Sequence, residues 1–377
     1  MAGQFPAITL TGPRQSGKST LCRAVFPRHA YANLELPDVR GFAKEDPRTF
    51  LGQFQSGAVL DEIQRAPELI SYLQGLIDDV PTPGRWVLTG SQNLAVLESV
   101  NQSLAGRTAV LHLPPLTRRE ILRFPTHPDS LDEAILFGGY PRIFDQRLDP
   151  SEWLASYIAT YIERDVRTIT NVGDLTTFQR FVELCAGRTA QLLNFSQLCN
   201  DCGIAQPTAK AWISVLEASF ITFRLPAFSG NFRKRLVKMP KLHFYDTGLA
   251  CRLLGIRTVE QLRSHPLRGP LFETWVVSEI RKYRLGAGQT GGMFHYRDQH
   301  GGEADLILES VDQWSLVEAK AGQTVVSGLF DSVRRIGEIL SQARHHQTFV
   351  IYGGDAEQKR SDVTLIPWAN LHGQEWA

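Results

Sequence analysis

The chain has 377 residues, of which 43% are hydrophobic and 21% charged, and its 40 basic and 39 acidic residues leave a net charge of +1. This length predicts two or three domains, each able to bury a core. The charge balance excludes a globally basic nucleic-acid binder, so any such surface would have to be local. No apolar run has membrane-spanning length and no secretory leader is visible, which predicts a cytoplasmic protein with no membrane partner.

Five cysteines are scattered along the chain, and only Cys199 and Cys202 are close together. A zinc site would need a second pair, and no βαβ context for redox chemistry surrounds this one. We therefore interpret both as reduced thiols.

A glycine-rich stretch, GPRQSGKST, covers residues 12–20 and fits the phosphate-binding motif G-x-x-x-x-G-K-[ST]. The apolar run AITLT before it predicts a strand, and STLCRAVF predicts a helix whose N-terminus favours anions. Lys18 would reach the β- and γ-phosphates, and Ser19 would hold Mg²⁺. The alternative is a chance glycine-rich turn. The predicted nucleotide-binding residues here are Gly12, Gly17, Lys18, Ser19 and Thr20.

A second acidic strand is predicted in GAVLDEIQ, where the apolar residues 58–60 precede Asp61 and Glu62. Asp61 would hold Mg²⁺ through water, and Glu62 would polarise the water that attacks the phosphate. A helix-capping acidic pair is the alternative. The apolar run and the position about forty residues after the glycine-rich loop, within the range of an α/β crossover, favour the strand.

A third strand, RWVLTGSQN, ends in polar residues, of which Ser91 is a candidate sensor of the γ-phosphate; a glycine-serine turn is the equal alternative. In SLAGRTAVLHLPPL a helix ends at Gly106 and a strand follows. These pieces resemble the AAA+ ATPases, in which this junction carries an arginine that reaches the nucleotide of a neighbouring subunit. The resemblance implies that role for Arg107. It implies that LFGGYPRIF begins a helical lid whose Arg142 senses phosphate, with a solvated surface charge as the alternative for each arginine.

The middle of the chain is predicted to be helical. The segment 151–169 has an apolar stripe at helical spacing, and 181–219 is interpreted as three helices, the last starting at Gln206 or Pro207. A helix, a short turn, a helix and the strand FITFRLPAF have the order of a winged helix. The basic run that follows could contact DNA phosphates or be a solvated loop. It contains Arg233, Lys234, Arg235, Lys238 and Lys241.

The last third predicts an amphipathic helix with Glu273 near its start, a hairpin that carries Asp305, and the strand WSLVEAKAG. Residues i and i+2 of a strand share a face, so Glu318 and Lys320 should point the same way, beside Asp305. Two carboxylates and a lysine could hold Mg²⁺ against a phosphodiester. The alternative is a structural ion pair.

This order resembles the PD-(D/E)xK nucleases, which implies catalytic roles for Glu273, Asp305, Glu318 and Lys320, and a metal bound by Asp305 and Glu318. Taken together, GPRQSGKST, DEIQ, SLAGR, GGYP, YDTGLA, EADLIL and VEAKAG resemble the bacterial and archaeal ATPase family that joins an AAA_14-type front to a DUF4143-type domain. The resemblance covers nearly the whole chain. It implies ATP and Mg²⁺ as cofactors and a homo-oligomer, a hexameric ring.

We therefore expect an α/β protein: an AAA+ P-loop parallel sheet, a helical lid, a winged-helix-like middle and a nuclease-like α/β tail. The expected regions are 1–122, 123–170, 171–240 and 241–377. The leading hypothesis is an ATPase that acts on DNA and has nuclease capacity. The alternatives are a DNA motor or branch-migration remodeller that does not cut, and a nucleotide-gated switch for a protein partner.

Overall fold

The computed structural model describes residues 1–90, 103–161, 175–228, 238–298, 302–325, 327–341 and 345–376. The described residues form two compact units, Met1–Pro114 with Ala218–Phe220, and Pro115–Glu217 with Ile221–Ala377. Within the described parts of the chain, no helix combines the length and the apolar character that crossing a bilayer requires.

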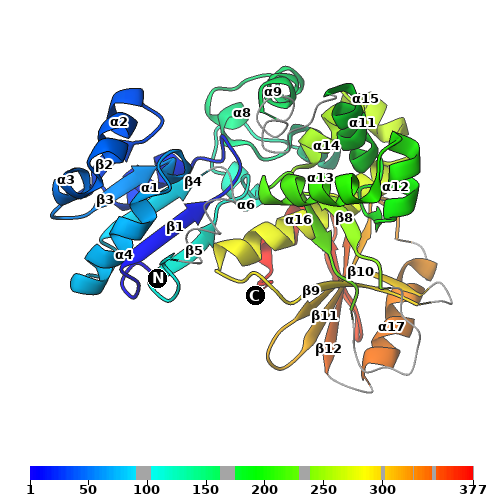
Figure 1. Ribbon diagram of the computed structural model, residues 1–377. Helices are drawn as coiled ribbons and strands as arrows, with labels where there is room; N and C mark the ends of the chain where they lie inside the picture. The colour runs from blue at the N-terminus through cyan, green and yellow to red at the C-terminus, as the bar shows by residue number, and fades with distance from the viewer. Residues whose placement is uncertain are drawn as a thin grey trace. The chain divides into compact units, whose positions relative to one another are not determined.

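The first unit is built on a five-stranded sheet in the order β2-β3-β4-β1-β5, with every neighbouring pair parallel. Its strands are predominantly buried, as expected for a parallel sheet, and the strand before the glycine-rich loop lies between two others (Figure 1). Leu60, Trp86 and Leu88 are fully buried in its main core. This sheet confirms the predicted P-loop architecture. The strands are β1 Ala7–Thr11, β2 Ala30–Asn33, β3 Ala58–Asp61, β4 Trp86–Gly90 and β5 Thr108–His112.

Helices connect β1 to β2, β2 to β3 and β3 to β4, as parallel crossovers require. The sequence predicts α1 and the strands β1, β3, β4 and β5, but β2 lies in the segment AYAN, which has no apolar run. The described helices of the first unit are α1 Lys18–Val25, α2 Pro37–Glu45, α3 Pro47–Gly52, the 3₁₀ turn η1 Ile63–Arg65, and α4 Leu69–Asp79.

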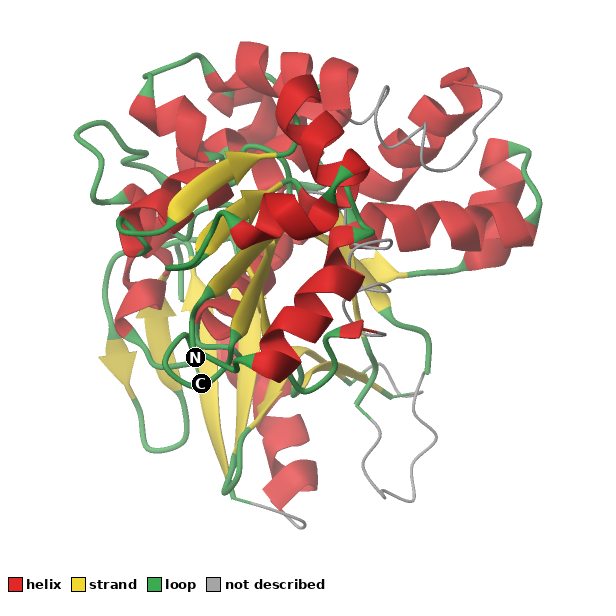
Figure 2. Ribbon diagram, turned by 60° about the vertical axis from the view of Figure 1, so that its left-hand side comes forward, coloured by secondary structure: helices red, strands yellow, loops and turns green. Residues whose placement is uncertain are grey.

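The part of the second unit before the tail is mainly helical, as predicted (Figure 2). The predicted three-helix segment forms three helices, and the third begins at Gln206. A small antiparallel sheet, β6-β8-β7, accompanies them. The elements are α6 Arg118–Ile121, α7 Leu131–Phe137, α8 Pro141–Asp145, α9 Pro150–Tyr157, α11 Leu175–Ala186, β6 Gln191–Leu192, α12 Phe195–Cys202, α13 Gln206–Ala218, β7 Thr222–Leu225, β8 Lys241–Phe244, α14 Thr247–Leu253 and α15 Val259–Ser264.

Two motifs that lie far apart in the sequence meet inside this unit. Asp246 caps α14 by accepting from Leu249 N at 2.8 Å, and its other oxygen accepts from Gly139 N at 2.7 Å. Gly138 has φ 67°, and a Cβ there would lie 2.2 Å from an Asp246 oxygen. Only glycine fits at this position, so FGGYP and YDTGLA form one interlocked joint.

The tail carries a six-stranded sheet in the order β13-β14-β12-β11-β10-β9. Strands β9, β10 and β11 form an antiparallel meander, which confirms the predicted hairpin, and β11, β12 and β14 run parallel. Helix α17 packs Val333, Ile336 and Leu340 into the core of this sheet. The elements are α16 Arg268–Gly286, β9 Met293–Arg297, β10 Glu303–Glu309, β11 Trp314–Lys320, η3 Ser327–Phe330, α17 Asp331–Ser341, β12 His346–Tyr352, β13 Gln358–Lys359, β14 Thr364–Pro367 and η4 Trp368–Gly373.

All five cysteines are buried free thiols, in agreement with the sequence interpretation. Cys199 and Cys202 both lie on α12.

Candidate functional site

The predicted acidic residue Asp61 is the last residue of β3 and lies buried at the carboxyl end of the parallel sheet. Ser19 donates its hydroxyl to Asp61 Oδ2 at 2.8 Å. Tyr31 on β2 donates to the same oxygen, and Thr89 on β4 donates to Oδ1. Three neutral hydroxyls, from one helix and two neighbouring strands, therefore hold this carboxylate.

Lys18 is buried at the start of α1, and its ammonium donates to the carbonyls of its own loop. Its Nζ lies 3.0 Å from Gly12 O and 2.7 Å from Pro13 O. Burial lowers the pKa of Lys18 to about 8, and the nearby Glu62 and Asp61 only partly oppose this shift. An anion placed against this ammonium would stabilise its charged form.

The glycine-rich loop leaves no room for side chains at its first position. A Cβ on Gly12 would lie 2.1 Å from Leu113 O. The loop backbone therefore packs directly against the segment that follows β5. Together with the N-terminus of α1, it forms a cradle of the kind that binds phosphate groups. The serine, the aspartate and the buried lysine at this cradle fit a Mg²⁺-nucleotide.

Glu62 follows Asp61 with φ 59° and ψ 48°, a left-handed conformation that is unfavourable for a glutamate. Its amide donates to Thr89 Oγ1 at 3.3 Å, and Gln64 Nε2 donates to its carboxylate. The backbone at this position is therefore held by a neighbouring strand. Strain of this kind costs about 1–3 kcal/mol and clusters at functional sites, so Glu62 stays a candidate site residue.

Arg107 lies at the amino end of the parallel strands, whereas the glycine-rich loop lies at their carboxyl end. The arginine precedes β5, whose Thr108 pairs with Ala7 at the amino end of β1, whereas the glycine-rich loop follows the carboxyl end of β1. Its guanidinium binds Asp78 through two bonds, at 2.5 Å and 2.9 Å. Both side chains are partly exposed.

For three other predicted residues, the described structure gives no support for the predicted role. Ser91 lies outside the described residues, and its role stays a prediction. Thr20 is exposed on α1. Arg142 is exposed on α8 and donates to Gln146 Oε1 at 3.4 Å.

Sequence reasoning missed Tyr31 and Thr89. Thr89 could have been found, because in parallel strands its place on β4 is level with Asp61 on β3, one position beyond the pair Leu60 and Leu88. Tyr31 gives no such signal, since β2 is short and lacks an apolar run. Arg23 stacks over the Tyr31 ring at 3.9 Å and holds it in place.

In the tail, the structure brings the predicted residues together. Leu306 pairs with Val317 in the antiparallel register, which places Asp305 beside Glu318. Asp305 Oδ2 accepts from Ala319 N at 2.9 Å, and Lys320 Nζ lies 2.6 Å from Glu318 Oε1. Glu318 and Lys320 therefore share a face of β11.

Lys241 corrects one part of the sequence interpretation. The basic run was expected to lie on the surface, yet Lys241 is only 1% exposed and is the first residue of β8. Its Nζ lies 2.7 Å from Glu273, 2.7 Å from Glu303 and 3.4 Å from Asp305. Of the other basic residues, Lys238 is exposed. The other three, Arg233, Lys234 and Arg235, lie outside the described residues.

The ion pairs of the tail form one group, the tail cluster, whose carboxyl groups lie close together. Its members are Lys241, Glu273, Glu303, Asp305, Glu318 and Lys320. Burial, with Asp305 as the next cause, raises the pKa of Glu318 to about 8. Burial and Asp305 likewise raise the pKa of Glu273. Burial lowers the pKa of Lys241, but Asp305, Glu273 and Glu303 outweigh it, so Lys241 stays charged.

The tail cluster does not fit the divalent metal that the nuclease resemblance implies. Lys241 is already bonded to Asp305, and Lys320 to Glu318. Across the described ranges, no group of three or more acidic, histidine or cysteine side chains is arranged to hold a metal ion. The metal-binding role of Asp305 and Glu318 therefore stays a prediction without geometric support.

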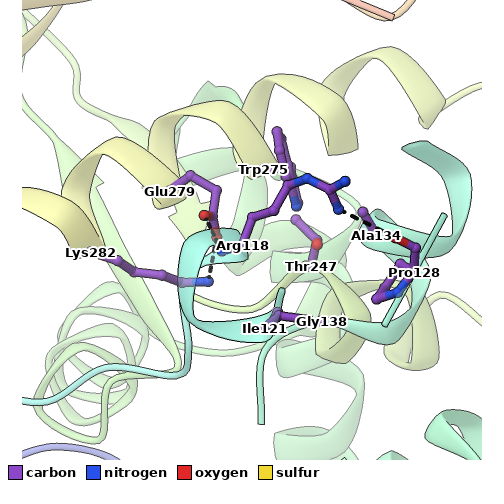
Figure 3. A pocket seen from close by; sticks show the side chains of 9 residues that line it. All are labelled: Arg118, Ile121, Pro128, Ala134, Gly138, Thr247, Trp275, Glu279 and Lys282. Carbon is purple, nitrogen blue, oxygen red and sulfur yellow. Dashed lines mark hydrogen bonds and ion pairs between the residues drawn. The ribbon is translucent and has the colours of Figure 1, made fainter. Parts of the chain in front are cut away.

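A separate pocket lies among α6, α7, α14 and α16 (Figure 3). Glu279 accepts from Arg118 N at 2.7 Å and from Lys282 Nζ at 3.0 Å, and Arg118 stacks over Trp368 at 4.2 Å. The pocket has a volume of about 10 Å³, room for about one water molecule. It is a polar structural joint and is too small for a nucleotide.

Three consecutive stretches of the chain match known families. Residues 4–122 match an AAA domain (AAA_14), 128–260 a domain of unknown function (DUF8612) and 268–371 another domain of unknown function (DUF4143). The chain is 30% identical over 307 residues to an uncharacterized protein of Mycobacterium tuberculosis and to one of Mycobacterium bovis, which is 81% of this chain and 68% of each relative. Among solved structures it is similar to a Walker-type ATPase of Pyrococcus abyssi at 16% identity and a TM-score of 0.40, over 66% of this chain and 91% of that one.

Proposed function

The chain belongs to the family of these mycobacterial proteins, with an AAA domain in front and a DUF4143 domain behind, and from this premise we propose that it hydrolyses ATP with Mg²⁺. The observation that carries the proposal is the junction of the glycine-rich loop with β3. There Ser19 lies 2.8 Å from Asp61 while Lys18 is buried behind the loop.

The residues of the first unit have distinct tasks in this proposal. Bound Mg²⁺-ATP supplies the bond to be broken and the cation that neutralises the phosphates. Lys18 leaves the carbonyls of its loop to contact phosphate oxygens, and Ser19 turns from Asp61 toward the cation. Asp61 stays in place because Tyr31 and Thr89 donate to it from two strands.

Glu62 is proposed to accept the proton of the attacking water. Its left-handed backbone departs from the extended geometry of β3, which ends one residue earlier. Gln64 donates to the carboxylate, which limits its freedom before substrate binds. A positioned general base of this kind contributes about 10²–10⁴-fold to a rate.

We further propose a homo-oligomer, a ring of the AAA+ kind, in which Arg107 acts on the neighbouring subunit. Arg107 precedes β5 at the amino end of the sheet, and a strand of five residues separates it from the loop edge. That distance is about 15 Å. Arg107 therefore cannot serve the loop of its own chain, which supports a role in trans.

The substrate of the ATP-driven work is proposed to be DNA. The support is the arrangement of Asp305, Glu318 and Lys320 on two adjoining strands, which resembles the order in DNA-cleaving domains. We propose no cleavage step, because the acidic side chains already bind lysines. A nucleotide-gated switch for a protein partner is the second candidate, and the ion pairs within the cluster favour it.

The test is the rate of ATP hydrolysis without DNA and with single-stranded, duplex and branched DNA. The proposal expects hydrolysis that is lost in Lys18→Ala and accelerated by at least one DNA form. Hydrolysis that no DNA form changes would favour the switch. Wild-type protein without ATPase activity in any oligomeric state would contradict the proposal.

A further inference from the structure

The tail cluster contains a buried cation, Lys241, which the sequence analysis had assigned to an exposed basic run. Lys241 enters the cluster from β8, Glu273 from α16, and Glu303 and Asp305 from β10. The Lys241 side chain is 2% exposed, and the Asp305 side chain 10%. The ammonium is therefore removed from water, and these carboxylates replace its hydration.

The hydrogen-bond capacity of this ammonium is fully used. A lysine ammonium has three donors. Lys241 Nζ has three carboxylate partners, two at 2.7 Å and one at 3.4 Å. A second ammonium, Lys320, binds Glu318 at 2.6 Å. Three of the four carboxylates thus bind Lys241 and the fourth binds Lys320, and Arg297 lies 3.8 Å from Glu303 as a more exposed third cation.

The backbone holds Lys241 at this position. Pro240 O accepts from Leu193 N at 2.8 Å, and Lys241 pairs with Leu192 on one side and with Leu225 on the other. Strand β8 is thus the middle strand of its sheet, and it contacts α16, which carries Glu273. A backbone shift that moved Lys241 out of the cluster would break strand pairing on both sides.

A divalent ion and this ammonium would need the same oxygens. Mg²⁺ requires carboxylate oxygens at about 2.0–2.1 Å. Asp305 would have to serve both cations. We infer that Lys241 is the resident cation of the tail cluster, and that Mg²⁺ or Mn²⁺ can bind there only when Lys241 is removed. The tail of the wild-type chain is then an ion-pair centre that works without metal.

This inference does not depend on ATP hydrolysis, since the tail cluster lies wholly within the second unit. The test measures Mn²⁺ binding to the full chain without nucleotide. The electron paramagnetic resonance signal of free Mn²⁺ reports how much of the ion is bound. The proteins compared are wild type, Lys241→Gln, Lys241→Arg and Asp305→Asn. The ATPase rate of the same samples shows separately whether the proposed function holds.

We expect wild type and Asp305→Asn to bind Mn²⁺ equally weakly. Lys241→Gln should bind it at least about tenfold more tightly, a gain of about 1.4 kcal/mol. Lys241→Arg keeps the charge and should not gain. A wild-type protein whose Mn²⁺ site is lost in Asp305→Asn would overturn the inference, as would a folded Lys241→Gln that gains nothing.

If Lys241→Gln does not fold, the comparison of wild type with Asp305→Asn can still overturn the inference. In that case, refolding with Mn²⁺ offers a second measurement. The inference expects Mn²⁺ to restore the melting transition of Lys241→Gln, because the ion replaces the missing ammonium. Failure of Mn²⁺ to restore it would count against the exchange of one cation for the other.

Discussion

The phosphate loop and the tail cluster both bring a buried lysine close to carboxylates, but the two lysines have different partners. Lys18 donates to two backbone carbonyls, and Asp61 accepts from three hydroxyls. In the tail, Lys241 binds three carboxylates directly. The first site keeps its charges apart and can exchange neutral partners for a charged ligand. In the second site the carboxylates already bind lysines of the same chain.

The largest expected effect separates the phosphate loop from the tail cluster through Arg107. In our proposal the phosphate loop needs this arginine from a neighbouring subunit, whereas the tail cluster has its cations within the chain. Arg107→Ala should bind ATP normally and hydrolyse it about a thousandfold or more slowly. Asp78→Ala is the matched control, because it removes the ion pair and keeps the arginine. Steady-state hydrolysis and nucleotide binding are measured on both variants.

Mixing Arg107→Ala with Lys18→Ala should restore part of the activity, because one interface can then pair an intact loop with an intact arginine. Equal losses in Asp78→Ala and Arg107→Ala would show that the arginine acts only through its ion pair. No recovery in confirmed mixed oligomers would contradict action in trans.

The second prediction concerns the strained glutamate. Glu62→Gln should keep ATP affinity and lower turnover by about 10²–10⁴-fold, because the attacking water loses its base. Single-turnover kinetics separate this effect from product release. Glu35→Gln, an exposed substitution in the same unit, serves as the control. Wild-type turnover in Glu62→Gln would remove Glu62 from the mechanism.

The third prediction tests the ion pairs of the tail cluster. Asp305→Ala leaves a buried ammonium with fewer counter-charges and should destabilise the tail by about 3–5 kcal/mol. ATP hydrolysis per folded molecule should not change. Denaturant unfolding gives the stability, and Glu309→Ala, exposed on the same strand, is the control. An unchanged stability would indicate that the cluster is weakly coupled to folding.

The smallest effect comes from a neutral group beside the tail cluster. Burial lowers the pKa of His295 to about 4 from 6.5. Between these values the unfolded chain binds more protons, so the free energy of unfolding falls as the pH drops from about 6.5 to 4, by up to about 3 kcal/mol. His295→Gln should flatten this acid limb, and the exposed His345→Gln should not. Parallel limbs in both variants and wild type would contradict the assignment.

The strands that lead into the candidate nucleotide site were predictable where an apolar run ends in polar residues. β1 and β3 have this pattern, so the glycine-rich loop and Asp61 were found at their ends. The segment AYAN lacks such a run, and β2 with its Tyr31 was therefore missed. Short strands at the edge of a sheet depend on tertiary partners more than on their own composition.

Lys241 was misread for a different reason. A count of basic residues predicts a solvated run, but every residue of the strand KLHF is buried. The partners that make this burial favourable come from Glu273 and Glu303, 32 and 62 residues further along the chain. A single sequence contains no signal for such a distant neutralisation.

The joint between Gly139 and Asp246 has a consequence for the order in which the second unit folds during synthesis. Its two halves are 107 residues apart, so at the usual speed of synthesis the first half waits roughly 5–20 s for the second. During that time the amide of Gly139 lacks its aspartate, and α7 and α9 lack their packing against α14. The nascent second unit therefore exposes apolar helix faces until residue 246 has left the ribosome, and chaperone binding should concentrate in this interval.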